Sequence, residues 1–194
     1  MKNIILIHGI AGYKRESYFE WLKPECEKLG LKVFMPQMPA FFEGGTYQQW
    51  REIFEKECVL SKDTIVYAQS LGTQFAVKYI DKDIAAYISC AAARNLLNVR
   101  PTQENNASAK NFEHMVPSFL VSEDEYAKFK SLKCPKFSLY SDNDNYFEQA
   151  NLEEYAKAIG SKPILVKGKG HFSINAGVHE LPEALEIIKG LVGK

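Results

Sequence analysis

Ser70 stands in a sequence context that suits a nucleophile. Residues 68–72 read Ala-Gln-Ser-Leu-Gly, between an apolar run and a helix-like pattern. A strand that turns at once into a helix brings positions 68 and 72 close together beneath the serine, so neither can be bulky. The serine is then exposed at the tip of the turn, where helix N–H groups face any negative charge beside it. Ala68 replaces the first glycine of the G-x-S-x-G pattern, and the plainer alternative is a serine that caps a helix.

A serine hydroxyl needs a base to take its proton and a third group to orient that base. His171 lies in residues 170–172 (Gly-His-Phe), just after a later apolar run, and can supply the base. Residues 141–144 (Ser-Asp-Asn-Asp) follow another run and offer two candidate acids, Asp142 and Asp144. The order serine, acid, histidine, each after a predicted strand, is typical of α/β hydrolases. The agreement of three separate loops is stronger evidence for this chemistry than any one motif.

Six short apolar runs predict the strands that carry these loops. The runs are residues 4–7, 32–35, 64–68, 85–90, 137–140 and 164–166. Their lack of polar alternation is typical of parallel strands covered on both faces. Apolar residues at helical spacing predict helices between them, across residues 18–29, 47–58, 75–79, 123–132 and 185–192. The chain is therefore predicted to have an α/β fold, a doubly wound, mainly parallel sheet of about six strands with helices on both faces.

A single domain, residues 1–194, is expected from the length of the chain. One irregular stretch, residues 91–135, separates the fourth and fifth predicted strands and is too long for a simple crossover. Apart from its one predicted helix, we expect this insertion to lie over the strand ends as a small lid or substrate-facing loop. Neither a repeat nor a linker divides the sequence.

The chain resembles the small single-domain serine hydrolases related to YdeN and retinoblastoma-binding protein nine. The matching segments are residues 6–9 (Leu-Ile-His-Gly), 68–72, 141–144 and 170–172, and the resemblance runs from the first strand to the last helix. It implies a minimal α/β-hydrolase fold and a catalytic triad of Ser70, Asp144 and His171. Asp144 is favoured over Asp142 because it occupies the position at which the family carries its triad acid. Asp142 is expected to bond to the backbone of its own turn.

Two backbone N–H groups are expected to form an oxyanion hole for the tetrahedral intermediate. Leu71, the residue after the nucleophile, supplies one of them. The glycine-rich loop after the first strand supplies the other, from Ile10 or from its neighbour Ala11, with Ile10 preferred. We expect His8 to orient this loop by hydrogen bonding rather than to act on substrate.

Composition and motifs indicate neither a charged partner nor a cofactor. The 24 basic and 24 acidic residues balance, so no nucleic-acid partner is expected. The four histidines and four cysteines show no metal-ligand spacing, and the glycines form no nucleotide-binding pattern. We therefore expect no metal and no cofactor. The N-terminal residues lack a secretory pattern and no run approaches the roughly 20 apolar residues of a membrane span, which predicts a cytoplasmic location.

Together these features predict a cofactor-free serine hydrolase that cleaves a small ester, or else a thioester or amide, through an acyl-enzyme. A protein-binding or regulatory module on the same frame is the alternative from another class, because folds of this kind host such functions. That alternative implies a protein partner, whereas the enzyme needs only a small-molecule substrate. A lyase that uses the same three residues is a third interpretation.

Overall fold

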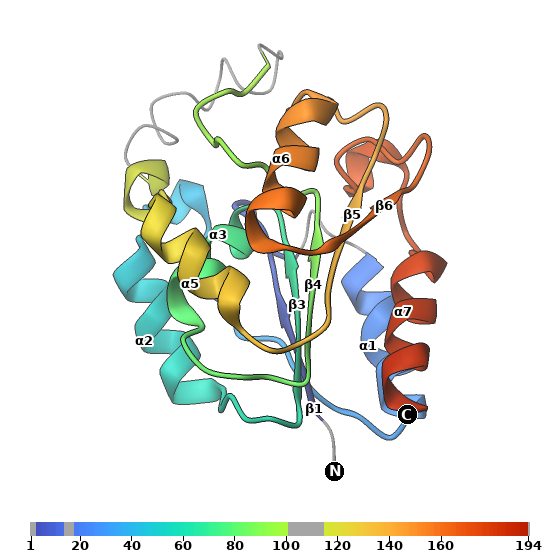
Figure 1. Ribbon diagram of the computed structural model, residues 1–194. Helices are drawn as coiled ribbons and strands as arrows, with labels where there is room; N and C mark the ends of the chain where they lie inside the picture. The colour runs from blue at the N-terminus through green and yellow to red at the C-terminus, as the bar shows by residue number, and fades with distance from the viewer. Residues whose placement is uncertain (1–2, 14–17, 101–114, 194) are drawn as a thin grey trace.

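A six-stranded sheet forms the centre of the molecule. The computed structural model describes residues 3–13, 18–100 and 115–193. The strand order is β2-β1-β3-β4-β5-β6, and all neighbouring strands are parallel. Figure 1 shows the sheet in the middle of the molecule, between layers of helices. The strands are β1 (Asn3–Ile7), β2 (Lys32–Phe34), β3 (Thr64–Gln69), β4 (Ala86–Cys90), β5 (Lys136–Tyr140) and β6 (Lys162–Leu165). All six predicted strands are present, and the predicted α/β fold is confirmed.

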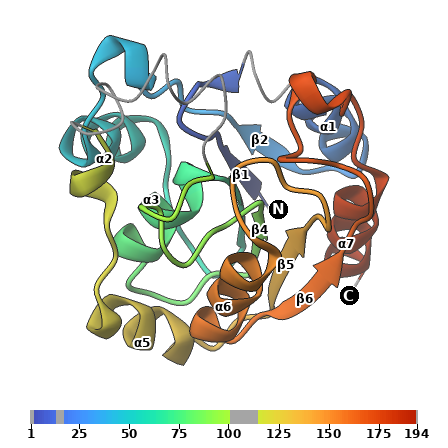
Figure 2. The same cartoon turned by 90° about the horizontal axis from the view of Figure 1, so that it is seen from above.

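Helices cover both faces of this sheet (Figure 2). The longer ones are α1 (Tyr18–Lys28), α2 (Tyr47–Glu57), α3 (Leu71–Tyr79), α5 (Glu123–Ser131), α6 (Gln149–Ile159) and α7 (Pro182–Val192). Short 3-10 helices are η2 (Phe41–Glu43) and η3 (Ile174–Ala176). Helices α1 and α7 pack on one face, and α2, α3, α5 and α6 pack on the other (Figures 1 and 2).

The two-sided cover explains why the strands read as continuous apolar runs. Successive side chains of a strand point to opposite faces of the sheet. In β1, Ile4 and Leu6 belong to the core beneath α1 and α7, whereas Ile5 and Ile7 belong to the core on the other face. All four are buried. Because helices cover both faces, both sets of positions in β1 are apolar.

Helix α6 lies outside the helices expected from the sequence. Its buried residues Leu152, Tyr155 and Ile159 follow helical spacing, and Gly160 ends it in the left-handed conformation with φ 67°. The sequence signal for this helix is therefore present. Helix α5 confirms the helix expected at 123–132, and Ser122 and Glu125 form a capping box at its start.

The expected insertion is described at its two ends. Residues 101–114, which form part of the expected lid, lie outside the described residues. At the N-terminal end of the insertion, the Asn151 side chain of α6 accepts from the N–H of Asn95 at 2.8 Å and donates to the Asn95 carbonyl at 2.9 Å. Toward the C-terminal end of the insertion, Lys78 of α3 donates to the carbonyl of Leu120 at 2.8 Å. Both described ends are thus tied to helices on the same face of the sheet.

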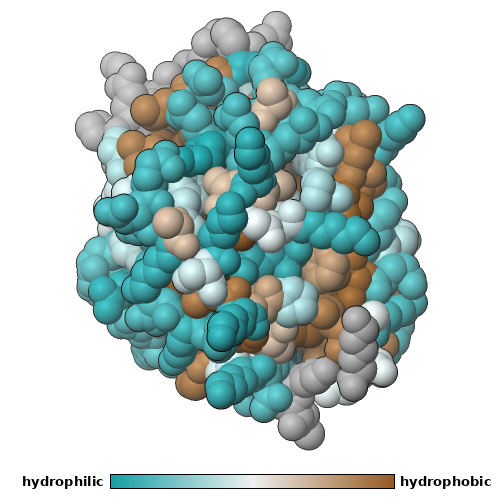
Figure 3. Space-filling view, in the orientation of Figure 1, coloured by the Kyte–Doolittle hydropathy of each residue, from teal (hydrophilic) through white to brown (hydrophobic). Residues whose placement is uncertain are grey.

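Polar residues cover most of the surface seen in Figure 3, and apolar residues form separate patches there. The most exposed large apolar side chains of the described chain are Val59, Leu97 and Phe42, at 75%, 66% and 64%. Within residues 3–13, 18–100 and 115–193, no helix combines the length and the apolar character that a membrane span needs.

The strand order brings the polar loops to one place. After β1 the chain passes to the edge strand β2 and then returns to the other side of β1 as β3. In open α/β sheets the ligand crevice opens at the carboxyl ends of the strands where the order reverses in this way. Ser70 and the loop that contains Ile10 both emerge at that point. The loops after β5 and β6 emerge at the same edge, because every strand is parallel.

Gly72 sets how closely α3 approaches the end of β1. A Cβ atom at this position would lie 2.4 Å from the carbonyl oxygen of His8 and 2.9 Å from that of Ile7. Such distances fall well inside van der Waals contact, and backbone atoms cannot rotate away as a flexible side chain can. The predicted need for a small residue at position 72 is therefore a need for glycine.

We expect Gly72→Ala to lower the free energy of unfolding by about 3 kcal/mol, because the added methyl overpacks against the β1 backbone. Urea unfolding followed by circular dichroism measures this. Gly190→Ala is the matched control: Gly190 lies in α7 with open space around it. That variant should gain about 0.5 kcal/mol from helix propensity and lower chain entropy. Two variants of equal stability would contradict the close approach.

His8 follows β1 and is buried in the core. Its Nδ1 lies 2.6 Å from the carbonyl oxygen of Gly9, and its Nε2 lies 3.2 Å from the backbone nitrogen of Met38. Nδ1 must therefore donate and Nε2 must accept, which only the neutral ring allows. Burial lowers the pKa of His8 to about 4. The expectation that His8 holds its loop by hydrogen bonding is confirmed.

This buried histidine makes stability depend on pH. The unfolded chain takes up a proton at His8 near pH 6.5, whereas the folded chain does so only near pH 4. Between these values the unfolded state binds more protons, so the free energy of unfolding falls as the pH falls. The full loss is about 3 kcal/mol. We expect His8→Gln to flatten this acid limb in urea titrations, and an unchanged slope would contradict a neutral His8.

Candidate active site

Ser70 occupies a tight turn between β3 and α3. Its backbone has φ 48° and ψ −120°, a conformation that costs a residue other than glycine on the order of 1–3 kcal/mol. The Ser70 N–H donates to the carbonyl of Cys90 at the end of β4, at 2.9 Å. Its carbonyl accepts from the N–H and the hydroxyl of Thr73, at 3.0 and 2.6 Å. These bonds hold the strained turn that the A-x-S-x-G motif predicts.

The Ser70 hydroxyl is not used as a helix cap. It makes no capping bond to α3, and its Oγ lies instead 2.9 Å from Nε2 of His171. The structure therefore contradicts the plainer alternative of a serine that only caps a helix. Leu71 is the first residue of α3, so its N–H has no carbonyl one turn earlier in the helix. The positive end of the α3 dipole faces the same region.

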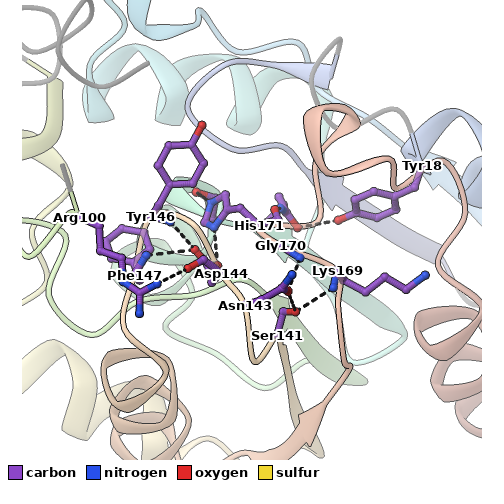
Figure 4. A network of polar contacts seen from close by, with 12 residues as sticks. Tyr18, Arg100, Ser141, Asn143, Asp144, Tyr146, Phe147, Lys169, Gly170 and His171 are labelled. Carbon is purple, nitrogen blue, oxygen red and sulfur yellow. Dashed lines mark hydrogen bonds and ion pairs between the residues drawn. The ribbon is translucent and has the colours of Figure 1, made fainter. Parts of the chain in front are cut away.

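His171 is held from its other side by Asp144. Nδ1 of His171 lies 2.7 Å from Oδ2 of Asp144 (Figure 4). Oδ1 of Asp144 accepts from the N–H groups of Tyr146 and Phe147, at 2.8 and 3.0 Å. The Asp144 side chain is fully buried, and that of His171 is 10% exposed. The structure thus brings together the three residues of the predicted triad.

The surroundings of Asp144 keep its carboxylate ionised. Burial by itself raises the pKa of Asp144, but the nearby His171 and the two N–H donors outweigh burial and hold the pKa below its usual range. An ionised Asp144 can only accept, so Nδ1 of His171 carries a proton. In the neutral ring Nε2 is then the free acceptor, and it faces Ser70 Oγ. The Tyr146 ring lies edge-on to the His171 ring, with centroids 4.8 Å apart. Figure 4 shows the two side chains beside each other.

The loop that carries His171 is clamped by the loop that carries Asp144. Three consecutive backbone N–H groups before His171 bond to three consecutive side chains before Asp144. We call this set of bonds the loop clamp. The donors and acceptors pair as Gly168 with Asp142 at 2.8 Å, Lys169 with Ser141 at 2.9 Å and Gly170 with Asn143 at 2.8 Å.

The loop clamp corrects one expectation and adds two residues. Asp142 bonds to Gly168 in another loop, so the expectation that it bonds within its own turn is wrong. Ser141 and Asn143 were not singled out by sequence reasoning, and the Ser141 hydroxyl also donates to Asn143 Oδ1 at 2.8 Å. A run of residues with short polar side chains is the signal available for them, because such side chains readily bond to nearby backbone.

Arg100 is a further residue that sequence reasoning missed. Its Nη1 donates to the carbonyl oxygen of Asp144 at 2.9 Å. Its guanidinium also pairs with both carboxylate oxygens of Glu148, at 2.7 and 2.5 Å. Its backbone N–H donates to the carbonyl of Tyr146 at 2.7 Å. Hydrogen bonds of Arg100 therefore join the N-terminal part of the insertion to the loop that carries Asp144.

The glycine-rich loop after β1 presents the Ile10 N–H. The Gly9 carbonyl accepts from His8 Nδ1 at 2.6 Å and from the Gly12 N–H at 3.3 Å. In a trans peptide the C=O and N–H groups point in opposite directions, so the Ile10 N–H is turned away from the His8 ring. The Ile10 carbonyl accepts from the N–H of Phe41 at 2.9 Å, which ties this loop to η2.

Metal binding has no visible site in the described ranges. Among residues 3–13, 18–100 and 115–193, no three His, Cys, Asp or Glu side chains are grouped so that they could hold an ion.

Comparison with solved structures supports the same fold. YdeN from Bacillus subtilis is 16% identical, covers 100% of both chains and gives a TM-score of 0.77. Carboxylesterase CesB from the same organism is 14% identical, covers 100% of this chain and 84% of its own, and gives 0.64. A serine hydrolase of carbazole degradation is 10% identical, covers 100% and 91%, and gives 0.65. At these identities the likeness concerns the fold, which is that of the α/β hydrolases.

Sequence comparison identifies the family. No protein of curated function matches the chain. A family model described as serine hydrolase matches residues 4–190, which is nearly the whole chain. The match includes Ser70, Asp144 and His171 and every strand residue except Asn3. The chain therefore belongs to the serine hydrolase family.

Proposed function

We propose that this serine hydrolase cleaves a small ester, or else a thioester or amide, through an acyl-enzyme formed on Ser70. One observation carries the proposal: Ser70 Oγ, the His171 ring and the Asp144 carboxylate form a continuous hydrogen-bonded line, with contacts of 2.9 and 2.7 Å. These lengths lie in the range that a nucleophile, its base and the orienting acid require.

In the acylation step, Ser70 Oγ attacks the substrate carbonyl while His171 Nε2 takes the hydroxyl proton. Asp144 holds the ring in the required tautomer and stabilises the imidazolium that forms. The N–H groups of Leu71 and Ile10 donate to the oxyanion, with Ala11 as the neighbouring alternative to Ile10. The imidazolium then gives its proton to the leaving alcohol, and the acyl group remains on Ser70.

In the deacylation step, His171 takes a proton from water, and the hydroxide attacks the acyl carbon. The same N–H groups stabilise the second oxyanion. His171 returns the proton to Ser70 Oγ as the bond to the acyl group breaks. The free acid leaves, and the enzyme returns to its starting state with no cofactor consumed.

Apolar side chains around the strand ends favour an uncharged, small substrate. Ile10, Phe41 and Tyr146 are partly buried and pack against the apolar core that includes Leu71. They come from the loops after β1, β2 and β5, so they lie at the edge of the sheet from which Ser70 also emerges. Apolar linings of this kind are usual in small-molecule sites. A carboxylesterase among the structural neighbours agrees with an ester substrate.

The proposed nucleophile can be tested with a fluorophosphonate probe. We expect the folded protein to be labelled once, at Ser70, and Ser70→Ala to be unlabelled, because only an activated serine reacts. Turnover of an aryl ester to its acid should fall by a factor on the order of 1,000 or more in the variant. Ser61→Ala is the control, because Ser61 bonds to Thr64 at the amino end of β3. A folded parent that resists the probe would contradict the proposal.

The assignment of the acid can be tested with two matched variants. Asp144→Asn should lower kcat by a factor of about 10,000, because an amide at this position favours the wrong His171 tautomer. Asp142→Asn should keep most of the activity, since its amide oxygen can still accept from the Gly168 N–H. Mass spectrometry and thermal melting show that both proteins are intact and folded. A larger loss in Asp142→Asn than in Asp144→Asn would reverse the assignment.

A further inference from the structure

Gln69 is a buried polar residue directly beside the proposed nucleophile. It is the last residue of β3 and is only 1% exposed. A carboxamide at such a site costs free energy unless it forms hydrogen bonds. Its Nε2 donates to the main-chain carbonyl of His171 at 3.0 Å. The residue before the nucleophile is thus bonded to the residue that carries the base, although 101 positions separate Ser70 from His171 in the chain.

The His171 carbonyl fixes the orientation of this amide, and two tyrosine hydroxyls extend its hydrogen-bond network. The Tyr18 hydroxyl lies 2.6 Å from Gln69 Oε1 and 3.1 Å from the Tyr67 hydroxyl. A carbonyl oxygen can only accept, so the NH₂ group of Gln69 must face His171 and its Oε1 must face Tyr18. Tyr18 therefore donates to Gln69, and its own oxygen can accept from Tyr67. Figure 4 shows Tyr18 extending into this network from the side of α1.

The His171 loop has an uncommon backbone that needs support. Gly168, Gly170 and Phe172 have φ values of 71°, 51° and 53°. The left-handed conformation at Phe172 persists only where the surroundings hold it. The loop clamp holds the N–H groups of residues 168–170, and Gln69 holds the carbonyl of His171. The base is therefore fixed through its backbone from β5 on one side and from β3 on the other.

We propose that Gln69 is a positioning residue that sets the distance between Ser70 Oγ and His171 Nε2. The inference rests on the proposed function of those two residues. Gln69 acts through the main chain of His171 and not on the substrate. Because Gln69 and Ser70 are adjacent at the end of one strand, the bond makes the nucleophile and the base move as one unit.

Gln74 provides a matched comparison for this role. It is also 1% exposed, and its Oε1 accepts from the Tyr126 hydroxyl at 3.0 Å. Its Nε2 donates to the carbonyl of Ala93 at 2.7 Å. Each glutamine is thus a buried amide with one tyrosine and one main-chain partner. Removal of either should cost similar stability, so a difference in rate reports positioning.

The test compares Gln69→Met with Gln74→Met, which keep side-chain length and remove the amide. We expect Gln69→Met to lower kcat and the rate of fluorophosphonate labelling by about 10–100-fold with little change in KM, because a small misplacement of the base is costly. Gln74→Met should stay close to the parent rate. Both should lower Tm to a similar extent. Equal losses of rate in the two variants would overturn the positioning role.

A second readout needs no substrate. The proton between His171 Nδ1 and Asp144 gives a low-field NMR resonance when the ring is held in place. We expect this resonance to persist in Gln74→Met and to broaden or shift in Gln69→Met. A parent that neither cleaves esters nor reacts with the probe contradicts the proposed function, whereas an unchanged resonance in Gln69→Met contradicts the positioning role.

Gln69→Glu separates the effect of the hydrogen bond on the rate from the effect of side-chain shape. Burial favours the neutral carboxyl, which can still donate one O–H bond toward the His171 carbonyl. At about pH 6 we expect Gln69→Glu to retain more of the parent kcat than Gln69→Met. A glutamate variant as slow as the methionine variant would contradict the proposal. If Gln69→Met does not fold, the glutamate variant is compared with the parent, and a loss of rate there counts against the proposal.

Discussion

The close approach of Gly72 to the backbone at the end of β1 is the constraint on which the site depends. The missing side chain lets α3 begin immediately beside the carbonyl groups of Ile7 and His8. Ser70 must then reverse the chain within one residue, which accounts for its φ of 48°. The same approach brings the first N–H of α3 beside the loop that carries Ile10. The positions of Ser70, of the α3 N-terminus and of the loop that carries Ile10 therefore all depend on one packing contact.

Hydrogen bonds from side chains to the backbone of its loop hold the base in place. Side chains of the Asp144 loop accept from the N–H groups before His171, and Gln69 donates to the His171 carbonyl. The ring is left free to use both nitrogens, one toward Asp144 and one toward Ser70. This division matters chemically, because a ring nitrogen spent on support would not be available to move a proton. Burial of Asp144 adds to the effect by excluding competing water from its bond to His171.

Much of the fold and of the candidate site was open to prediction because its signals are local. Six apolar runs mark six buried strands, and the small residues around Ser70 mark the turn. The prediction for Asp142 was wrong because its acceptor bond goes to Gly168, 26 positions away, and no local pattern reveals such a partner. The roles of Gln69, Ser141 and Arg100 were not predicted because their partners are also distant in the sequence. Helix α6 lies outside the predicted helices although its buried residues Leu152, Tyr155 and Ile159 follow helical spacing.

The amino-acid sequence by itself determined the element order, the small residues at the turn, and the serine, acid and histidine that follow strands. These depend on periodicity and on steric limits between near neighbours in the chain. Only the tertiary structure decided that Asp144 and not Asp142 meets His171, and that Gln69 holds the His171 carbonyl. Both outcomes depend on loops that meet across β3, β5 and β6. Hydrogen bonds act over about 3 Å, and only the folded sheet brings residues so distant in sequence within that range.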